Sequence, residues 1–520
     1  MTDNGDFDQS KILEFMARPE AYEPRPATVE RIETHGSIVF LAGSLAYKIK
    51  RAVKYAFLDF STLEKRQEAC LNELRINLRT APQIYLDVVP IRRAEIDDFV
   101  LGAGAGAAVE WALRMRRFDQ EGLYDRMAAE GRLPLTAMPP LAEAIAAFHD
   151  FADRVLTVEQ GVAPLEGVIC DNETVLAADT DLFPADLAEA FAGRTREAFG
   201  ALKPFLCARA RGGYVRHCHG DLHLRNIVEI DGAPVLFDAI EFDDRLATID
   251  VLYDLAFLLM DLGKRGLGAH ANTLLNAYLD RESTTGNLLG LATLPLFLSL
   301  RAMIRAKVEL LRADRTEGPE ANHARAEAHE YFLLALDFLT LRQPRLIAIG
   351  GLSGSGKSAL SRALAPHVGL FPGAVQVRSD VERKRLFGVS LHERLPERAY
   401  TSDVSRQVYA TCLKRARLAL EAGHSVIVDA VQAMPEERAA IEALAAARPV
   451  SFAGIWLKAP AEVMRNRVVG RQGDVSDATP SVVDTQLGYV LGAMSFQPVD
   501  ADRPLTDVVA ACRQLIEATG

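Results

Sequence analysis

The sequence lacks the features that mark disulfide-bonded, thiolate-metal and secreted proteins. Six cysteines are scattered over 520 residues with no Cys-x-x-Cys pair, so we expect neither a disulfide framework nor a thiolate metal site. The first ten residues are acidic and polar, which is not the pattern of a secretory signal. We therefore expect a cytoplasmic protein with reduced thiols.

Long hydrophobic runs and an excess of positive charge are also missing. The apolar run 288–300 contains a proline and stops at Arg301, short of the roughly 20 residues that span a bilayer. It predicts a buried helix rather than a membrane segment. The net charge of −11 argues against broad attraction to nucleic acid or to anionic membranes. The hydrophobic share of 49% and charged share of 25% are typical of soluble globular proteins.

The pattern of predicted elements changes along the chain. Residues 37–50 read as two strands joined by a turn at Gly43. Residues 61–79 predict a helix, because Ser61 and Glu64 have capping-box spacing. Its expected apolar face consists of Leu63, Cys70, Leu71, Leu74 and Leu78.

Helical patterns dominate from about residue 111 until Gln343-Pro344, where the apolar strand RLIAIG begins. A chain of this length is expected to form about three packing units. We predict a strand-rich lobe over 1–110, a helix-rich lobe over 111–342 and a separate domain over 343–520.

Residues 219–226, HGDLHLRN, contain His, Asp and Asn at the offsets of the protein-kinase catalytic loop. A phosphotransferase must orient an acceptor hydroxyl and hold magnesium against the nucleotide phosphates. We predict that Asp221 orients the acceptor or takes its proton. Asn226 and Asp238, which follows an apolar strand, are predicted metal ligands. His223 and Asp254 are expected to be structural, and spacing assigns no role to Glu241 or Asp243.

The strand AYKIK places Lys48 and Lys50 on one face, because side chains alternate along a strand. One of them is expected to reach the α- and β-phosphates of ATP. By analogy with kinases, a glutamate of the next helix should hold that lysine, and Glu68 and Glu73 are the candidates. We favour Lys48 with Glu73, although periodicity leaves both choices open.

The motif HGDLHLRN with the downstream FDAIEFDD resembles the aminoglycoside phosphotransferase group of the protein-kinase-like fold. The resemblance covers about residues 30–330 and implies an α+β fold with two lobes. No G-x-G-x-x-G precedes Lys48, and no A-P-E element follows Asp238. The second absence favours a small molecule over a protein as the phosphate acceptor.

A second phosphate-binding motif, GLSGSGKS, fills residues 351–358 between an apolar strand and a helical pattern. It matches the P-loop, in which backbone N–H groups surround phosphate oxygens. Lys357 is expected to reach the β- and γ-phosphates, and Ser358 to hold magnesium. The predicted nucleotide-binding residues of this loop are Gly351, Ser353, Gly354, Ser355, Gly356, Lys357 and Ser358.

Three further segments favour a kinase over a motor or a switch. The strand HSVIVDA ends in Asp429, a predicted magnesium carboxylate. Asp380 and Arg383 resemble the D-x-x-R pair with which small-metabolite kinases hold an acceptor hydroxyl, although an i,i+3 ion pair would give the same spacing. The segment MRNRVVGRQGD supplies the candidate lid arginines Arg465, Arg467 and Arg471.

Residues 345–520 thus look like a gluconate-kinase or shikimate-kinase type of domain, with a parallel sheet. The whole chain resembles the bifunctional aminoglycoside phosphotransferase and ATP-binding protein family. This resemblance implies an ATP- and Mg²⁺-dependent phosphotransferase with two nucleotide sites and a small hydroxylated acceptor. The alternatives are a P-loop ATPase regulated by an idle kinase-like module, and a polynucleotide-end kinase, which the acidic charge disfavours.

Overall fold

The computed structural model describes residues 9–34, 36–55, 58–95, 98–155, 157–282, 284–470 and 475–519. The chain forms two compact units. The first comprises the residues up to Pro164 together with Ala210–Asp254, and the second comprises Leu165–Arg209 and the chain from Leu255 onward. The predicted boundary at 342–343 falls inside the second unit, and the three-part division of the chain remains a prediction.

An antiparallel six-stranded sheet forms the core of the first unit, in the order β1-β2-β3-β8-β6-β7. The predicted hairpin over 37–50 is confirmed, because β2 pairs with β3 around Gly43. The strands of this sheet are β1 Val29–Glu33, β2 Ser37–Ala42, β3 Leu45–Lys50, β6 Tyr85–Glu95, β7 Asp98–Leu101 and β8 Ala108–Arg116.

Helix α2 (Leu63–Asn77) packs on β3, β6 and β8 of this sheet. Its N-cap is Thr62, whose Oγ1 accepts the Lys65 N–H at 3.4 Å, so the predicted capping role of Ser61 is wrong. Ser61 instead donates to Asp59. The predicted apolar face is also wrong in part: Leu71 and Leu78 are exposed.

Three polar side chains of α2 face inward because they bind partners there. Glu73 and Asn77 are fully buried, and Arg66 is nearly so. Periodicity assigns burial by hydropathy alone and therefore misses a helix face that carries ion pairs.

The other first-unit elements include three short antiparallel pairs, β4–β5, β10–β11 and β12–β9. Residues 218–226 run between β9 and β10, and residues 237–243 follow β11, so the two predicted catalytic segments flank one hairpin. These elements are α1 Gln9–Met16, β4 Lys54–Tyr55, β5 Leu58–Asp59, α3 Tyr124–Ala129, α4 Met138–Phe151, β9 Val215–His217, β10 Ile227–Ile230, β11 Ala233–Leu236, α7 Asp244–Ala247 and β12 Thr248–Asp250.

The second unit begins with helices and ends with a parallel sheet. Residues Gly286–Ala313 are long and apolar enough to cross a membrane, but 78% of their most apolar stretch is buried in the fold, as predicted for a core helix. The helices are α5 Val158–Ala178, α6 Ala185–Arg211, α8 Val251–Lys264, α9 Gly268–Arg281, α10 Gly286–Gly290, α11 Leu294–Ala313 and α12 Pro319–Phe338, of which α5, α6 and α8 cross the unit boundary.

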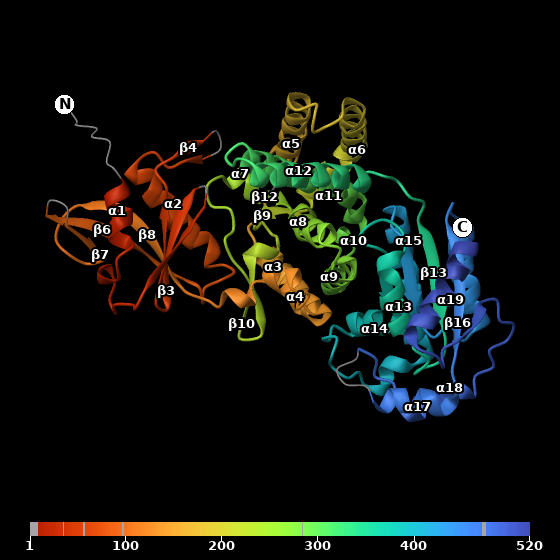
Figure 1. Ribbon diagram of the computed structural model, residues 1–520. Helices are drawn as coiled ribbons and strands as arrows, with labels where there is room; N and C mark the ends of the chain where they lie inside the picture. The colour runs from red at the N-terminus through yellow and green to blue at the C-terminus, as the bar shows by residue number, and fades with distance from the viewer. Residues whose placement is uncertain are drawn as a thin grey trace. The chain divides into compact units, whose positions relative to one another are not determined.

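The parallel sheet has five strands in the order β14-β15-β13-β16-β17 and lies within the blue-green end of the chain (Figure 1). Its strands are β13 Arg345–Gly350, β14 Val375–Arg378, β15 Val426–Asp429, β16 Ser451–Lys458 and β17 Gln497–Asp500. The helices that follow them are α13 Lys357–Leu364, α14 Ser379–Phe387, α15 Ser402–Glu421, α16 Pro435–Ala446, α17 Ala461–Val469, α18 Pro480–Leu487 and α19 Leu505–Ala518.

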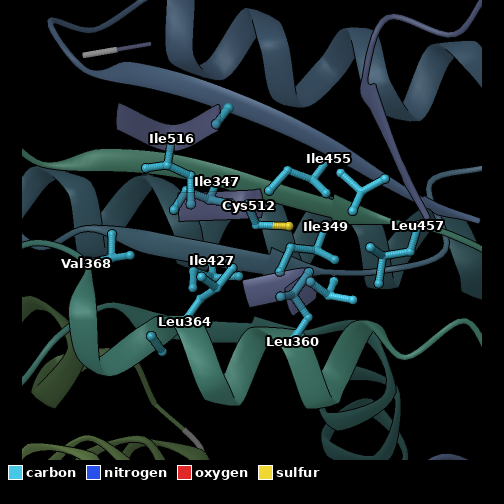
Figure 2. Packing of buried hydrophobic residues seen from close by; sticks show 14 of the residues in the cluster. Ile347, Ile349, Leu360, Leu364, Val368, Ile427, Ile455, Leu457, Cys512 and Ile516 are labelled. Atoms are coloured by element: carbon cyan, nitrogen blue, oxygen red, sulfur yellow. The ribbon is translucent and has the colours of Figure 1, made fainter. Parts of the chain in front are cut away.

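Helices α13 and α19 pack together on one face of this sheet, and Figure 2 shows the buried side chains between α13 and the strands. Ile347 and Ile349 of β13 meet Leu360 of α13 and Cys512 of α19 in one buried cluster. Helix α15 packs against β13, β14 and β15. The fold class is as predicted: an α+β fold with an antiparallel sheet, followed by an α/β P-loop domain with a parallel sheet. In such α/β sheets, ligands bind at the carboxyl ends of the strands.

A buried ion pair joins α2 to the sheet of the first unit. The Arg66 Nε atom lies 2.9 Å from both carboxylate oxygens of Glu110 on β8. Glu110 also accepts from the Trp111 N–H and from the Gln9 amide. Breaking one side of a buried pair leaves an uncompensated charge, which is more costly than replacing both partners.

We therefore expect Arg66→Met to lower the free energy of unfolding by about 3–5 kcal/mol, measured by urea titration. The double variant Arg66→Met/Glu110→Gln should recover more than half of that loss, because it also removes the stranded carboxylate. Equal destabilisation in the single and double variants would contradict this reading.

Candidate active sites

The predicted catalytic loop of the first unit is held by hydrogen bonds from both ends. The Asn226 Nδ2 atom donates to the Asp221 carbonyl at 2.9 Å and to its Oδ2 at 3.0 Å. His219 is fully buried, and its Nε2 lies 2.9 Å from the Phe237 carbonyl. Burial lowers the pKa of His219. The loop therefore presents Asp221, whose side chain is 37% exposed, on a fixed base.

Asp254 anchors the beginning of this loop. Its carboxylate accepts the backbone N–H groups of His219 at 3.1 Å and Gly220 at 2.9 Å. His149 Nε2 lies 3.1 Å from the same carboxylate. These contacts fit the structural role expected for Asp254.

Lys48 lies between the two predicted nucleotide-site carboxylates. Its Nζ atom is 2.8 Å from Glu73 Oε1 and 2.7 Å from Asp238 Oδ1. Glu68 is exposed. Lys50 also reaches Glu73, at 2.6 Å from Oε2, and forms an ion pair with Glu241. The structure thus brings together the favoured pair and adds a second lysine and a second glutamate.

Charge compensation governs this cluster of Lys48, Lys50, Glu73 and Glu241. Burial alone would raise the pKa of Glu73, but the ammonium groups of Lys48 and Lys50 lower it to about 2. Burial raises the pKa of Glu241 against the opposing effect of Lys50. Burial lowers the pKa of Lys50, but Glu241 and Glu73 more than offset this and leave it raised. Both lysines remain ammonium groups at neutral pH.

Asp238 occupies a left-handed backbone conformation with φ of +59°, which costs free energy for a non-glycine residue. Two hydrogen bonds hold it there. The Tyr85 hydroxyl oxygen accepts the Asp238 N–H at 3.1 Å, and Asn77 Oδ1 accepts the Ala239 N–H at 2.9 Å. The resulting turn directs the Asp238 carboxylate at Lys48.

Sequence reasoning missed three contacts at this site. His223, expected only to pack the loop, places its Nε2 3.3 Å from Asp221 Oδ2. Lys50 and Glu241 were not assigned the ion pair that they form. Asp243 caps α7 by accepting the Arg245 N–H at 2.9 Å. The position of His223 two residues after Asp221 was the available signal.

The P-loop of the second unit connects β13 to α13. Gly351, Gly354 and Gly356 all have positive φ, which favours glycine. A Cβ atom on Gly354 would lie 2.4 Å from the Met464 carbonyl oxygen. Ser355 is buried, and the Ser353 N–H donates to Gln486 Oε1 at 2.7 Å. The glycines thus allow a tight loop that α17 and α18 approach closely.

Two predicted metal-site residues meet beside this loop. The Ser358 Oγ atom donates to Asp429 Oδ2 at 2.6 Å, and Arg378 Nε lies 3.7 Å from the same oxygen. Lys357 Nζ donates to the Leu352 carbonyl at 3.1 Å. The Ser358 hydroxyl and the Asp429 carboxylate suit magnesium, which prefers oxygen ligands, and the N-terminus of α13 favours the phosphates.

The predicted acceptor residues line the same cavity as the P-loop, which has a volume of about 1390 Å³. Arg383 donates to the Ala399 carbonyl at 2.5 Å and to Ser405 Oγ at 3.3 Å, and its guanidinium stacks on the Tyr400 ring. Asp380 lies on the cavity wall on the same helix, α14. The structure thus brings both residues to the predicted site.

The lid arginines have different surroundings. Arg467 lines the cavity, where it donates to the Ala501 carbonyl at 2.8 Å and approaches the Ser355 carbonyl at 3.5 Å. Arg465 instead pairs with Asp484 at 2.7 Å. Arg471 lies outside the described residues.

Known proteins match both parts of the chain. An AAA domain family model matches residues 346–490. A choline/ethanolamine kinase family protein from Mesorhizobium loti is 17% identical, with a TM-score of 0.38 over 63% of this chain and 99% of that chain. A gluconokinase from Sinorhizobium meliloti 1021 is 23% identical, with a TM-score of 0.25 over 34% of this chain and 94% of that chain.

The family model and the glycine-rich loop show that the chain ends in a P-loop domain. Over 477 residues the chain is 32% identical to the uncharacterized protein Rv2004c of Mycobacterium tuberculosis, with 90% of both chains covered. An uncharacterized protein of Mycobacterium bovis matches at the same identity and coverage. The chain belongs to the family of these mycobacterial proteins.

The choice between the two lysines can be tested by single substitutions in a Lys357→Ala background, which removes the P-loop lysine. We expect Lys48→Met to weaken ATP binding by about 10- to 100-fold, because it removes the partly exposed charge beside Asp238. Isothermal titration calorimetry measures this affinity.

Lys50→Met serves as the matched variant. Because Lys50 neutralises two buried carboxylates, its loss should lower the free energy of unfolding by about 3–5 kcal/mol. A nucleotide-affinity loss confined to Lys50→Met would reverse our assignment.

Proposed function

We propose that this protein is an ATP- and Mg²⁺-dependent phosphotransferase with two nucleotide sites, each of which transfers the γ-phosphoryl group to a hydroxyl of a small molecule. The observation that supports this proposal best is that each site contains both a lysine placed to bind phosphate and a carboxylate suited to bind a metal ion. Lys48 meets Asp238 in the first unit. In the second, Lys357 and Ser358 begin one helix and Ser358 meets Asp429. Phosphoryl transfer depends mainly on such positioning and charge.

In the first site, the Asp221 carboxylate orients the acceptor hydroxyl and takes its proton as the phosphoryl group is transferred. Asn226 supports this role because its amide fixes both the backbone and the carboxylate of Asp221. Asn226 and Asp238 are the residues that would hold magnesium, and Lys48 would bind the phosphates. Magnesium would neutralise negative charge on the nucleotide phosphates.

In the second site, the backbone N–H groups of the P-loop and Lys357 bind phosphate, and Ser358 and Asp429 would hold magnesium. Arg467 is placed to neutralise the transferring phosphoryl group, since it approaches the loop at Ser355. Asp380 and Arg383 of helix α14 bind the acceptor hydroxyl.

The cavity supports a small acceptor. Its volume of about 1390 Å³ exceeds the roughly 300–1,000 Å³ of common ligand pockets, which leaves room for a nucleotide and an acceptor together. Charged and hydroxyl side chains line it, including Arg378, Arg406, Tyr409 and Glu437. The net charge of −11 disfavours a polynucleotide acceptor. We also propose a cytoplasmic location without membrane attachment.

The function can be tested by measuring ATP consumption with sugars, polyols, aminoglycosides and amino alcohols. Wild type, Asp221→Asn and Lys357→Ala are compared in parallel. At the first site we expect Asp221→Asn to lower an acceptor-stimulated rate by about 10²–10⁴-fold. Lys357→Ala should abolish the rate that depends on the second site.

Each variant reports on one site. A rate lost only in Lys357→Ala would assign the chemistry to the P-loop domain and make the first unit a binding module. ATP hydrolysis that no acceptor stimulates would refute the phosphotransferase proposal. Phosphorylation of an oligonucleotide end would refute the small-molecule acceptor.

A further inference from the structure

Two buried asparagines of helix α9 cap the edge strand of the P-loop sheet. Asn272 is 1% exposed and Asn276 is 7% exposed. Asn276 Nδ2 donates to the Ala374 carbonyl at 3.2 Å, and its Oδ1 accepts the Gln376 N–H at 2.7 Å. The amide therefore satisfies the groups that an additional strand would satisfy beside β14, the outer strand of the sheet.

The same hydrogen-bond network continues to the nucleotide helix. Gln376 Nε2 donates to Asn272 Oδ1 at 3.2 Å, and the Ser361 Oγ atom donates to Gln376 Oε1 at 3.2 Å. Ser361 is fully buried and lies one helical turn after Lys357 on α13. A chain of buried polar groups thus links α9 to the helix that begins at the P-loop lysine.

Helix α9 also contacts the acceptor helix α14. The Asp280 carbonyl accepts from Arg385 at 2.9 Å, and the carboxylate of Asp280 lies 3.7 Å from the same guanidinium. Arg385 pairs in turn with Glu382, which lies 3.0 Å from Arg415. Helix α14 carries Asp380 and Arg383 to the cavity, so α9 contacts the elements that carry both halves of the second site.

These contacts hinder helix α9 from sliding along strand β14. A Cβ atom on Gly373, just before β14, would lie 2.9 Å from Asn272 Nδ2. Because buried amides must keep their partners to avoid a desolvation cost, a shift of α9 along β14 would break several hydrogen bonds at once. Occupation of the P-loop and the position of α9 should therefore depend on each other.

We propose that Asn272 and Asn276 are positioning residues for the P-loop nucleotide site, although they lie far before it in the sequence. They act through Gln376 and Ser361 and do not touch the nucleotide. The inference rests on the proposed binding of ATP at this site. Under this proposal, helix α9 contributes to nucleotide binding by the P-loop domain.

Hydrogen exchange of the full-length protein tests this coupling, with and without a magnesium complex of a non-hydrolysable ATP analogue. We expect the analogue to slow amide exchange several-fold in peptides covering 351–364 and also in those covering 268–281. Lys357→Ala should remove both effects, because it removes the P-loop lysine.

A substitution separates positioning from stability. Asn272→Leu keeps the number and branching of the side-chain heavy atoms but removes the link to Gln376, and we expect about 2- to 30-fold weaker binding of the analogue to the P-loop. The matched control is Asn287→Leu, because Asn287 is a buried amide of the same unit that contacts Arg209 instead. This control should lower the melting temperature without changing the affinity.

The outcomes are distinguishable. Slowed exchange at 351–364 with none at 268–281 would overturn the coupling while leaving the nucleotide site intact. Equal affinity losses in Asn272→Leu and Asn287→Leu would reduce the asparagines to packing residues and overturn the proposal. No slowing at 351–364 would refute the nucleotide site itself, and with it this inference.

Discussion

The buried carboxylate of Glu73 is the constraint around which the first site is arranged. A charge without solvent is stable only when it is paired and hydrogen-bonded. Each of its oxygens takes one lysine of β3, which fixes α2 against the strand. The same lysines then bind Asp238 and Glu241 from the segment after β11. Charge compensation thereby holds together helix α2, strand β3 and the segment after β11.

The segments that sequence predicts well are those in which the chemistry is contiguous. Residues 351–358 and 219–226 contain their functional groups within eight positions, so the spacing reports the local backbone directly. The glycines of the P-loop have positive φ, as the motif requires. Asp221 and Asn226 are joined by hydrogen bonds within their own loop.

The remaining features depend on partners that are distant in sequence. Lys50 is equivalent to Lys48 by strand alternation, and their separate partners, Asp238 for Lys48 and Glu241 for Lys50, distinguish them from 190 and 191 residues away. Leu71 and Leu78 have the hydropathy of core residues, yet Glu73 and Asn77 occupy the buried face of α2. Thr62 caps that helix because Ser61 is engaged by Asp59. Hydropathy and spacing cannot encode such competition between tertiary partners.

The edge of the parallel sheet extends the same principle from charges to amides. An apolar contact between α9 and β14 would bury surface but would tolerate several registers, because hydrophobic attraction is non-directional. Asn276 instead supplies one donor and one acceptor to Ala374 and Gln376, and only one register satisfies both. Helix α9, which precedes the P-loop by about 80 residues, therefore fixes the register of β14. Strand β14 ends at Arg378, beside the Asp429 carboxylate. Directional pairing makes the helical segment and the P-loop domain one structural unit.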